Sequence, residues 1–361
     1  MSQIKNLTRK LSAAYPWTST PLIVGAPMRI MSGPALAVAV SRAGGLGFIG
    51  PSAKTKDTFG DLEEARSRIE ADRANARLAR HLSESGHLPV GVGFQLWNDD
   101  AETAVSAIEE YKPCATWLFA PREEEIEKGQ REFDSWTEHI RRVSSQTKIW
   151  VQIGTLAEAK ALLASRSAPD VVVVQGAEAG GHGRAKDGLG LVSLLPEMAD
   201  AFHAREDIAL VGAGGVADAR GAAAVLCLGA SGVAMGTRFL AASEARISKG
   251  YQDEVVRATD GAANTTRTTL YNQLRGTVGW PDCFSPRTIT NRSWSDYLAG
   301  VPFAELKKRH DEAAKAGDQG WGPEGRLATY AGASIGLVRE VKGADEIVEE
   351  VQEGVCQSLD L

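Results

Sequence analysis

The amino-acid sequence predicts an α/β protein, a (β/α)8 TIM barrel with an added and mostly helical cap domain. The first observation behind this prediction is a set of eight short apolar runs that are rich in β-branched residues or end in Gly. Nearly continuous apolar runs are typical of parallel strands that are buried on both faces. The expected strands are Pro21–Pro27, Gly44–Gly50, Leu88–Leu96, Cys114–Ala120, Lys148–Gly154, Asp170–Gly176, Ile208–Gly214 and Gly232–Leu240.

The second observation is that stretches of helical character separate most of these runs. They are rich in Ala and charged residues, and examples are Ala35–Arg42, Asp99–Tyr111, Leu156–Ser165 and Ala217–Leu228. Alternation of strands and helices predicts a parallel sheet. Eight such units suit a closed barrel of about 250 residues, and a doubly wound open sheet is the competing interpretation.

The alternation stops after residue 240. Residues 241–326 are polar and are interrupted by several Pro and Gly, so we expect a mostly helical insertion that acts as a cap or substrate domain. Helical patterning returns at Leu327–Val341 and Glu346–Cys356. The predicted division is therefore a barrel made of residues 1–240 and 327–361, with 241–326 as the cap.

Composition and charge argue against several classes of function. The chain carries 40 Lys and Arg against 46 Asp and Glu, so no basic excess is present to neutralise the phosphates of a nucleic acid. Its 4 Cys lack paired spacing, and we expect neither a metal site nor a disulfide framework. No run of about 18 apolar residues exists that could span a membrane.

The first 20 residues lack the apolar core of a signal peptide. They contain Lys5, Arg9 and Lys10, and no acidic residue precedes Asp57. We therefore expect a cytoplasmic location, with a mitochondrial presequence as the minor alternative.

Active sites of such barrels lie at the carboxyl ends of the strands. The segment Ala26-Pro27-Met28 follows the first expected strand. Pro27 stiffens the exit of the strand, and the polarizable side chain of Met28 can lie against a flat ring. A turn with a core Met is the alternative interpretation.

Three Gln lie near the ends of expected strands in apolar surroundings: Gln95, Gln152 and Gln175. A side-chain amide both donates and accepts hydrogen bonds, which suits the edge of a heterocycle. For each Gln, hydrogen bonding to neighbouring backbone is the equally open alternative.

His182 follows the sixth expected strand and lies among Gly180, Gly181 and Gly183. Such a loop gives little packing to bury an imidazole and lets a ligand approach closely. We expect this His to titrate near neutral pH and to act as a general base, with a surface loop His as the alternative. Arg184 is a possible anion-attracting neighbour. The remaining His lie in polar helical stretches and are expected at the surface: His81, His87, His139, His203 and His310.

Gly-rich turns follow the last two expected strands. Gly214 and Gly215 precede Asp218, which is expected to cap the next helix, and the second turn is Met235-Gly236-Thr237. Exposed N–H groups at such turns bind anions, and the loops after strands seven and eight form the usual phosphate site of these barrels. A phosphate-bearing cofactor is therefore expected.

Five blocks of these residues resemble, in this order, the nitronate monooxygenase family, formerly called 2-nitropropane dioxygenases. Together they cover about residues 20 to 240, and the C-terminal part matches only loosely. The blocks are Pro21–Met28, Ser41–Gly47, Gln175–His182, Gly214–Asp218 and Met235–Phe239.

The resemblance implies an FMN enzyme in which Ala26 and Met28 touch the flavin ring, Gln95 and Gln175 hydrogen-bond the flavin, and His182 is catalytic. Many members of the family have an Asn where this chain has Gln95. The resemblance also implies that glycines and Thr237 hold the phosphate. The complete set of predicted cofactor-binding residues is Ala26, Pro27, Met28, Gln95, Gln152, Gln175, Gly180, Gly181, Gly214, Gly215, Met235, Gly236 and Thr237.

The implied reaction is the oxidation of alkyl nitronates by O2 to a carbonyl compound and nitrite. Nitroalkanes are a further implied substrate, from which His182 would remove the α-proton; with a preformed nitronate it would stabilise the anion instead. Two alternatives stay open. One is an NAD(P)H-dependent quinone or enoyl reductase on the same FMN barrel, and the other is a phosphate-binding barrel without flavin.

Overall fold

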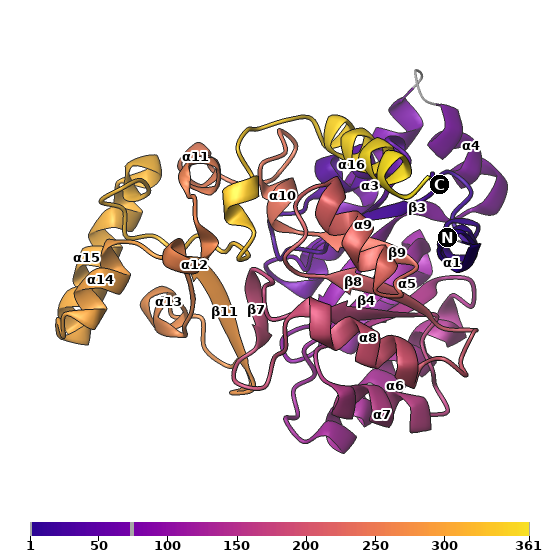
Figure 1. Ribbon diagram of the computed structural model, residues 1–361, viewed down its shortest axis with the longest axis horizontal. Helices are drawn as coiled ribbons and strands as arrows, with labels where there is room; N and C mark the ends of the chain where they lie inside the picture. Colours follow the sequence, from indigo (N-terminus) through magenta and orange to yellow (C-terminus); the bar gives the residue numbers. More distant parts are fainter. Residues whose placement is uncertain (1, 73–75, 361) are drawn as a thin grey trace.

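The computed structural model describes residues 2–72 and 76–360, and its centre is a closed barrel of eight parallel strands (Figure 1). β1 pairs with both β2 and β9, which closes the sheet on itself and excludes the open-sheet alternative. All eight predicted strands are present. They are β1 (Leu22–Gly25), β2 (Leu46–Ile49), β3 (Leu88–Gln95), β4 (Pro113–Phe119), β5 (Lys148–Ile153), β6 (Val171–Gln175), β8 (Ala209–Ala213) and β9 (Gly232–Met235).

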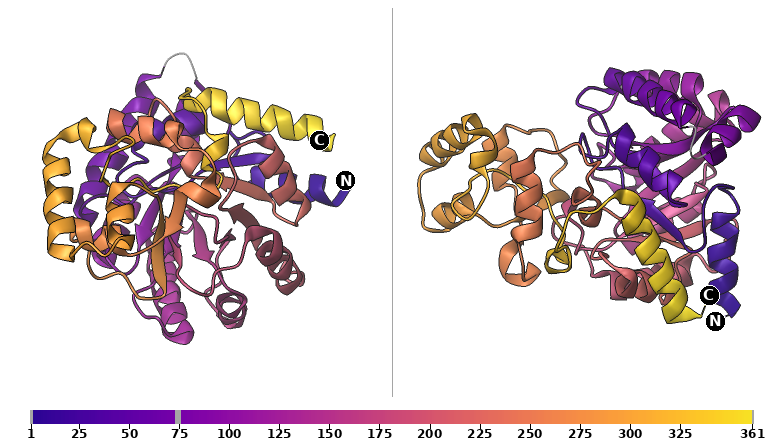
Figure 2. Two further views of the ribbon diagram at one scale, coloured as in Figure 1. Left: turned by 60° about the vertical axis from the view of Figure 1, so that its left-hand side comes forward. Right: turned by 90° about the horizontal axis from the view of Figure 1, so that it is seen from above.

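Helices surround the barrel, as the alternation predicts (Figures 1 and 2). Asp218 caps α9 by accepting from the N–H groups of Arg220 and Gly221, as expected. The surrounding helices are α1 (Ser2–Ser12), α2 (Pro34–Arg42), α3 (Thr58–Ala71), α4 (Ala76–Ser85), α5 (Ala101–Tyr111), α6 (Ile126–Val143), α7 (Leu156–Ala164), α8 (Leu191–Ala201), α9 (Ala219–Cys227) and α16 (Ala344–Leu359), with a 3-10 turn η1 (Thr55–Asp57) before α3.

Aromatic side chains fill the interior of the barrel. The ring of Phe48 lies 5.2 Å from that of Trp117 and 5.1 Å from that of Trp150, and the two indoles are stacked at 5.6 Å. Each of these side chains is at most 1% exposed. Burial of such large rings contributes strongly to stability. The packed rings also fill the barrel below its carboxyl end, so the interior is a core and not a channel.

A separate lobe lies beside the barrel and contains a three-stranded sheet in the order β10-β11-β7 (Figures 1 and 2). β7 (Gly181–Arg184) follows the barrel strand β6 in the chain and pairs with β11 of the lobe. This strand therefore joins the sheet of the lobe to the barrel. The expected division at residues 240 and 327 stays a prediction. The other elements of the lobe are β10 (Thr265–Arg267), β11 (Phe284–Ile289), α11 (Lys249–Arg257), α12 (Gly261–Asn264), α13 (Leu270–Arg275), α14 (Arg292–Leu298), α15 (Phe303–Lys315) and η2 (Gly317–Gly320).

Three expectations from the sequence are wrong. The eighth strand ends at Met235, because the chain turns at Gly236 and continues as α10 (Thr237–Leu240). Leu327–Val341 is not helical apart from a short turn, η3 (Ile335–Leu337), because its backbone is used in tertiary contacts: Thr329 accepts from Ile289, and Gly332 donates to Thr237. His310 is only 5% exposed rather than on the surface.

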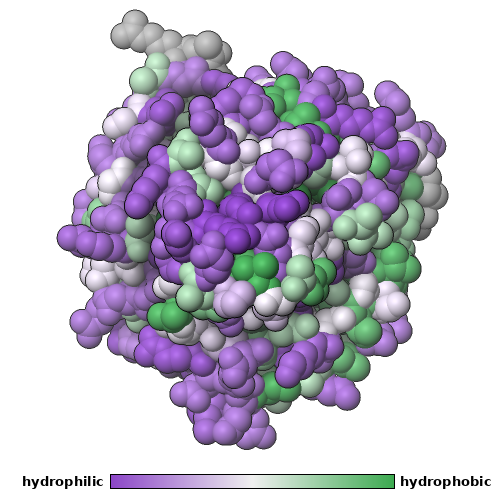
Figure 3. Space-filling model, turned by 90° about the vertical axis from the view of Figure 1, so that its left-hand side faces the viewer, coloured by the Kyte–Doolittle hydropathy of each residue, from purple (hydrophilic) through white to green (hydrophobic). Residues whose placement is uncertain are grey.

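The outer face of the lobe is mainly hydrophilic, with small scattered hydrophobic areas (Figure 3). Among the described residues, no helix combines the length and apolar character needed to cross a membrane. Residues 2–72 and 76–360 contain no cluster of His, Cys, Asp and Glu that is suited to a metal ion.

Candidate active site

A cavity of about 530 Å³ lies at the carboxyl end of the barrel and is closed on one side by residues of the lobe. This volume is in the range of small-molecule and cofactor sites. Twelve of the thirteen predicted cofactor-binding residues line it together with His182: Ala26, Pro27, Met28, Gln95, Gln152, Gln175, Gly180, Gly181, Gly214, Gly215, Gly236 and Thr237. Residues that are 210 positions apart in the sequence, such as Ala26 and Gly236, therefore meet in one site.

Met235 is the predicted residue that does not line the cavity. Its side chain is 1% exposed and belongs to the core of the barrel, while its carbonyl oxygen accepts from the Ala26 N–H at 3.0 Å. Met235 therefore supports the strand ends rather than facing a ligand.

The turn after β8 presents backbone donors to the cavity. Gly214 and Gly215 have φ angles of +102° and +75°, which L side chains rarely adopt, so this backbone conformation requires Gly. The N–H groups of Gly214, Gly215 and Val216 find no acceptor among the residues described. Unpaired N–H groups that line a concave turn are suited to hold an anion.

Gly181 and Gly236 also line the cavity and leave open space where a side chain would lie. No atom lies within 4 Å of the position of a Cβ at Gly181, and at Gly236 the nearest atom is the sulfur of Met28 at 3.6 Å. Thr237 is held in place because its hydroxyl accepts from the Gly332 N–H at 2.9 Å. The glycines thus form a cradle that side chains would fill.

The three predicted Gln have different hydrogen-bonding states. Gln152 Oε1 accepts from Trp117 Nε1 at 3.1 Å, and Gln175 Nε2 donates to the carbonyl oxygen of His182 at 3.4 Å. Gln95 Oε1 is buried and has no partner in the described chain. A buried acceptor without a partner is costly in a folded protein, so Gln95 is the Gln best placed to bind a ligand donor.

His182 lies on β7, opposite Pro286 of β11, and its ring is enclosed by residues of the lobe. Asn272 Nδ2 is 3.0 Å from His182 Nε2. Trp280 stacks on the imidazole with a centroid distance of 3.7 Å, and the ring of Tyr330 lies 6.0 Å away. The lobe therefore holds the imidazole of His182 by a hydrogen bond at Nε2 and by a stacked ring on one face.

Burial lowers the pKa of His182 to about 3, because an imidazolium loses its hydration there, and the nearby Arg267 guanidinium lowers it further. The expectation that His182 titrates near neutral pH is therefore wrong. The Gly-rich sequence around His182 indicates an exposed loop, whereas the lobe covers the ring. The imidazole is neutral at pH 7.

Arginines dominate the charge of the cavity, and sequence reasoning missed them. Arg29, Arg246 and Arg275 line the cavity, and none of its lining residues in the described chain is Asp or Glu. Arg275 donates to the Tyr330 hydroxyl at 2.7 Å, whereas Arg246 is paired with Asp61 at 2.7 Å. An excess of cations over carboxylates in an enclosed site favours anionic ligands.

Arg184, a possible anion-attracting neighbour on the sequence, does not line the cavity and is paired instead with Asp187 and Glu158. Of the aromatic residues of the lobe, Trp280 lines the cavity, while Tyr271 is fully buried in the packing of the lobe. Asn272, Arg275, Trp280 and Tyr330 carry no local sequence signal for this site, because they lie about 90 residues or more from His182 in the sequence and meet it only in the folded chain.

Comparisons with known proteins agree with this arrangement. Residues 132–354 match the family model described as nitronate monooxygenase. The chain is 58% identical to nitronate monooxygenase npaC of Metarhizium robertsii, over 95% of this chain and 93% of that protein. It also shares its fold with nitroalkane oxidase from Streptomyces ansochromogenes (TM-score 0.70, 23% identity, covering 97% of this chain and 98% of the other). A third similar structure is the enoyl reductase domain of MlnA from Bacillus amyloliquefaciens (TM-score 0.69, 11% identity, covering 98% of this chain and 97% of the other).

The two structural similarities concern the fold alone, since a barrel of this kind supports many reactions. The family match covers more than half of the chain, and the identity to the Metarhizium robertsii protein extends over nearly all of it. The residues predicted from the five sequence blocks also lie together at one cavity. This chain belongs to the nitronate monooxygenase family.

Proposed function

We propose that this enzyme binds FMN in the cavity and oxidises alkyl nitronates with O2 to a carbonyl compound and nitrite. The observation that carries the proposal is the composition of the cavity. One site contains glycines with free N–H groups, the unpartnered acceptor of Gln95 and the neutral His182. Arginines line this site, and no carboxylate of the described chain does.

The residues present fit FMN. The phosphate would lie beside Gly214, Gly215 and Gly236, where the N–H groups of Gly214 and Gly215 are free and a Cβ at Gly236 would meet no protein atom closer than 3.6 Å. Gln95 Oε1 would accept from the N–H edge of the flavin ring, which gives this buried atom its missing partner. The side chain of Met28 would lie against the ring.

When bound, FMN supplies the redox chemistry with the substrate and O2, while the protein binds and orients the reactants. A nitronate is an anion, and Arg29 and Arg275 attract it into the cavity. The neutral His182 hydrogen-bonds its oxygens without leaving a charge buried. Trp280 excludes water from one face of the imidazole.

The experiment that tests this proposal is oxygen uptake by the purified, FMN-loaded protein, with propyl nitronate and NADH added separately. We expect rapid uptake and nitrite release with the nitronate and no response to NADH. If the nitronate causes no oxygen uptake and NADH bleaches the flavin, the proposal is overturned in favour of a quinone or enoyl reductase. A protein that takes up no FMN would favour a phosphate-binding barrel without flavin.

A further inference from the structure

The amide of Asn272 contacts one of the two ring nitrogens of His182. Asn272 Nδ2 lies 3.0 Å from His182 Nε2, and the Asn272 side chain is 6% exposed. In this orientation of the amide, Asn272 Nδ2 donates and His182 Nε2 accepts, while Asn272 Oδ1 is buried without a partner in the described chain. A neutral imidazole carries one N–H, and the proton is then on Nδ1.

No described residue hydrogen-bonds to His182 Nδ1, and His182 lines the cavity. Three cations lower the pKa of the imidazole: Arg267 from β10, Arg275 from α13 and Arg29 from the turn after β1. These charges oppose a second proton on the ring. His182 therefore offers the cavity an N–H donor at Nδ1 rather than a lone pair.

The helix that carries Asn272 is packed firmly against its neighbours. This helix is α13, whose Leu270 and Leu274 are at most 2% exposed in a small apolar cluster with Leu306. The adjacent Tyr271 is fully buried, and its hydroxyl donates to Asn291 Oδ1 at 2.6 Å.

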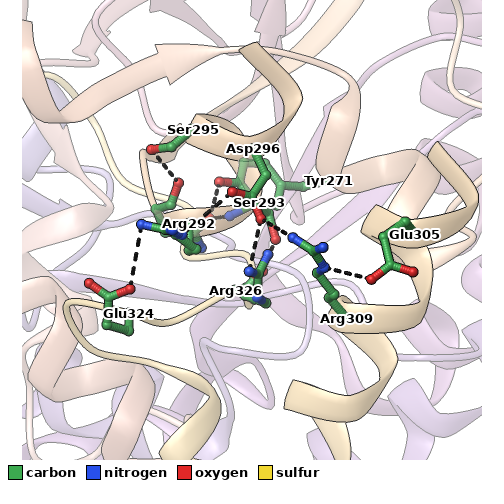
Figure 4. A network of polar contacts seen from close by, with 10 residues as sticks. Tyr271, Arg292, Ser293, Ser295, Asp296, Glu305, Arg309, Glu324 and Arg326 are labelled. Atoms are coloured by element: carbon green, nitrogen blue, oxygen red, sulfur yellow. Dashed lines mark hydrogen bonds and ion pairs between the residues drawn. The ribbon is translucent and has the colours of Figure 1, made fainter. Parts of the chain in front are cut away.

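Asn291 in turn caps α14 by accepting from the Ser293 N–H, and a network of charged side chains surrounds Asp296 of this helix (Figure 4). Arg309 and Arg326 lie 2.9 Å and 2.8 Å from the Asp296 carboxylate. Arg292 of the same helix bonds Asp296 at 3.4 Å. The hydrogen bond between Tyr271 and Asn291 therefore joins α13 to the end of the helix that carries this network.

We propose that Asn272 is a positioning residue that fixes His182 in the Nδ1–H tautomer and thereby selects preformed nitronates over neutral nitroalkanes. This inference rests on the function proposed above. An Nδ1–H group donates to an oxygen of the nitronate anion. Removal of the α-proton from a nitroalkane instead needs a lone pair at that nitrogen, which this tautomer does not present.

The direct test is ¹⁵N NMR of the FMN-loaded protein labelled at histidine, with His182→Gln used to assign the His182 signals. We expect Nδ1 to be protonated and Nε2 unprotonated in the natural protein. In Asn272→Asp the carboxylate can only accept, so the proton is expected to move to Nε2. In Asn272→Leu, which removes the hydrogen bond at similar size, the tautomer preference is expected to be lost. Protonation of Nε2 in the natural protein, or one tautomer in all three proteins, would overturn the proposal.

Kinetics provides a second readout. Asn272→Asp is expected to raise the ratio of nitropropane turnover to propyl nitronate turnover at least about tenfold, because the lone pair at Nδ1 becomes available to take the α-proton. Gln273→Glu is the matched control, since it places the same added charge on the exposed side of α13, and its ratio should not change. An unchanged ratio in Asn272→Asp would also overturn the proposal. The NMR measurement does not depend on turnover. Absence of nitronate oxidation would therefore reject the proposed function, whereas the tautomer of His182 could still be measured by NMR.

Discussion

The imidazole of His182 lies flat against the indole of Trp280, with ring centroids 3.7 Å apart and planes 3° from parallel. Trp280 itself is supported by Trp97, whose ring centroid lies 4.9 Å away. This aromatic layer keeps water from one face of His182 and contributes to the burial that lowers its pKa to about 3. The environment of His182 is therefore built mainly by the lobe rather than by the barrel.

Replacing Trp280 by Ala should raise the pKa of His182 from about 3 toward its ordinary value of 6.5, because water can then hydrate the imidazolium. The measurement is an NMR pH titration of ¹⁵N-labelled histidine. Trp280→Phe keeps an aromatic ring over His182 and should retain most of the lowered pKa. A His182 that titrates identically in the natural protein and in Trp280→Ala would contradict this role of the indole.

The barrel could be predicted from the sequence because its strands are short, apolar and β-branched. Val171–Gln175 is a clear example, with four consecutive Val that are buried on both faces. The residues at the strand ends could be predicted too, since parallel strands bring their carboxyl ends to one edge. Once the eight strands are placed, Met28, Gln95 and Gly214 must lie near one another.

The lobe's contribution to the site could not be predicted, because it depends on contacts across long sequence separations. Gly181–Arg184 forms β7 by pairing with β11, although its glycines indicate a loop rather than a strand. This pairing brings Asn272 and Trp280 to His182 from about 90 and 100 residues away. The loss of hydration at His182 follows from the same pairing, so a local pattern could not give its pKa.

His182 should make the stability of the protein depend on pH. Its folded pKa of about 3 lies below the ordinary value of 6.5, so between these values the unfolded chain binds a proton that the folded protein does not. The stabilising contribution is complete above pH 6.5 and is lost as the pH falls toward 3. His182→Gln removes this proton linkage.

Between pH 7 and pH 5 the natural protein should lose about 2 kcal/mol more free energy of unfolding than His182→Gln. Urea unfolding at a series of pH values measures both proteins under the same conditions. Parallel pH profiles for the two proteins would show that His182 is not buried in its neutral form.

Gln95 and Gln152 should respond differently to replacement by Leu. Gln95 Oε1 has no protein partner in the described chain, so Gln95→Leu removes a ligand contact and should weaken FMN binding about three- to tenfold, the value of one hydrogen bond. Gln152 Oε1 already accepts from Trp117, so Gln152→Leu leaves a buried indole N–H unpaired and should mainly lower the melting temperature. Fluorescence titration with FMN and thermal unfolding separate the two effects. Equal losses of FMN affinity would contradict the assignment of Gln95.

Gly236 offers a direct test of the phosphate cradle, because its backbone has a negative φ of −107° and a Cβ would meet no protein atom closer than 3.6 Å. Gly236→Ala should therefore fold normally, yet its methyl group projects into the space that the phosphate needs. We expect FMN affinity to fall at least about tenfold, which corresponds to about 1.4 kcal/mol. Gly60→Ala is the matched control, since Gly60 lies in α3 with no atom within 4 Å of a Cβ, and it should bind FMN as the natural protein does. Unchanged FMN affinity in Gly236→Ala would place the phosphate elsewhere, whereas a loss of affinity with normal thermal stability locates it at the turn after β9.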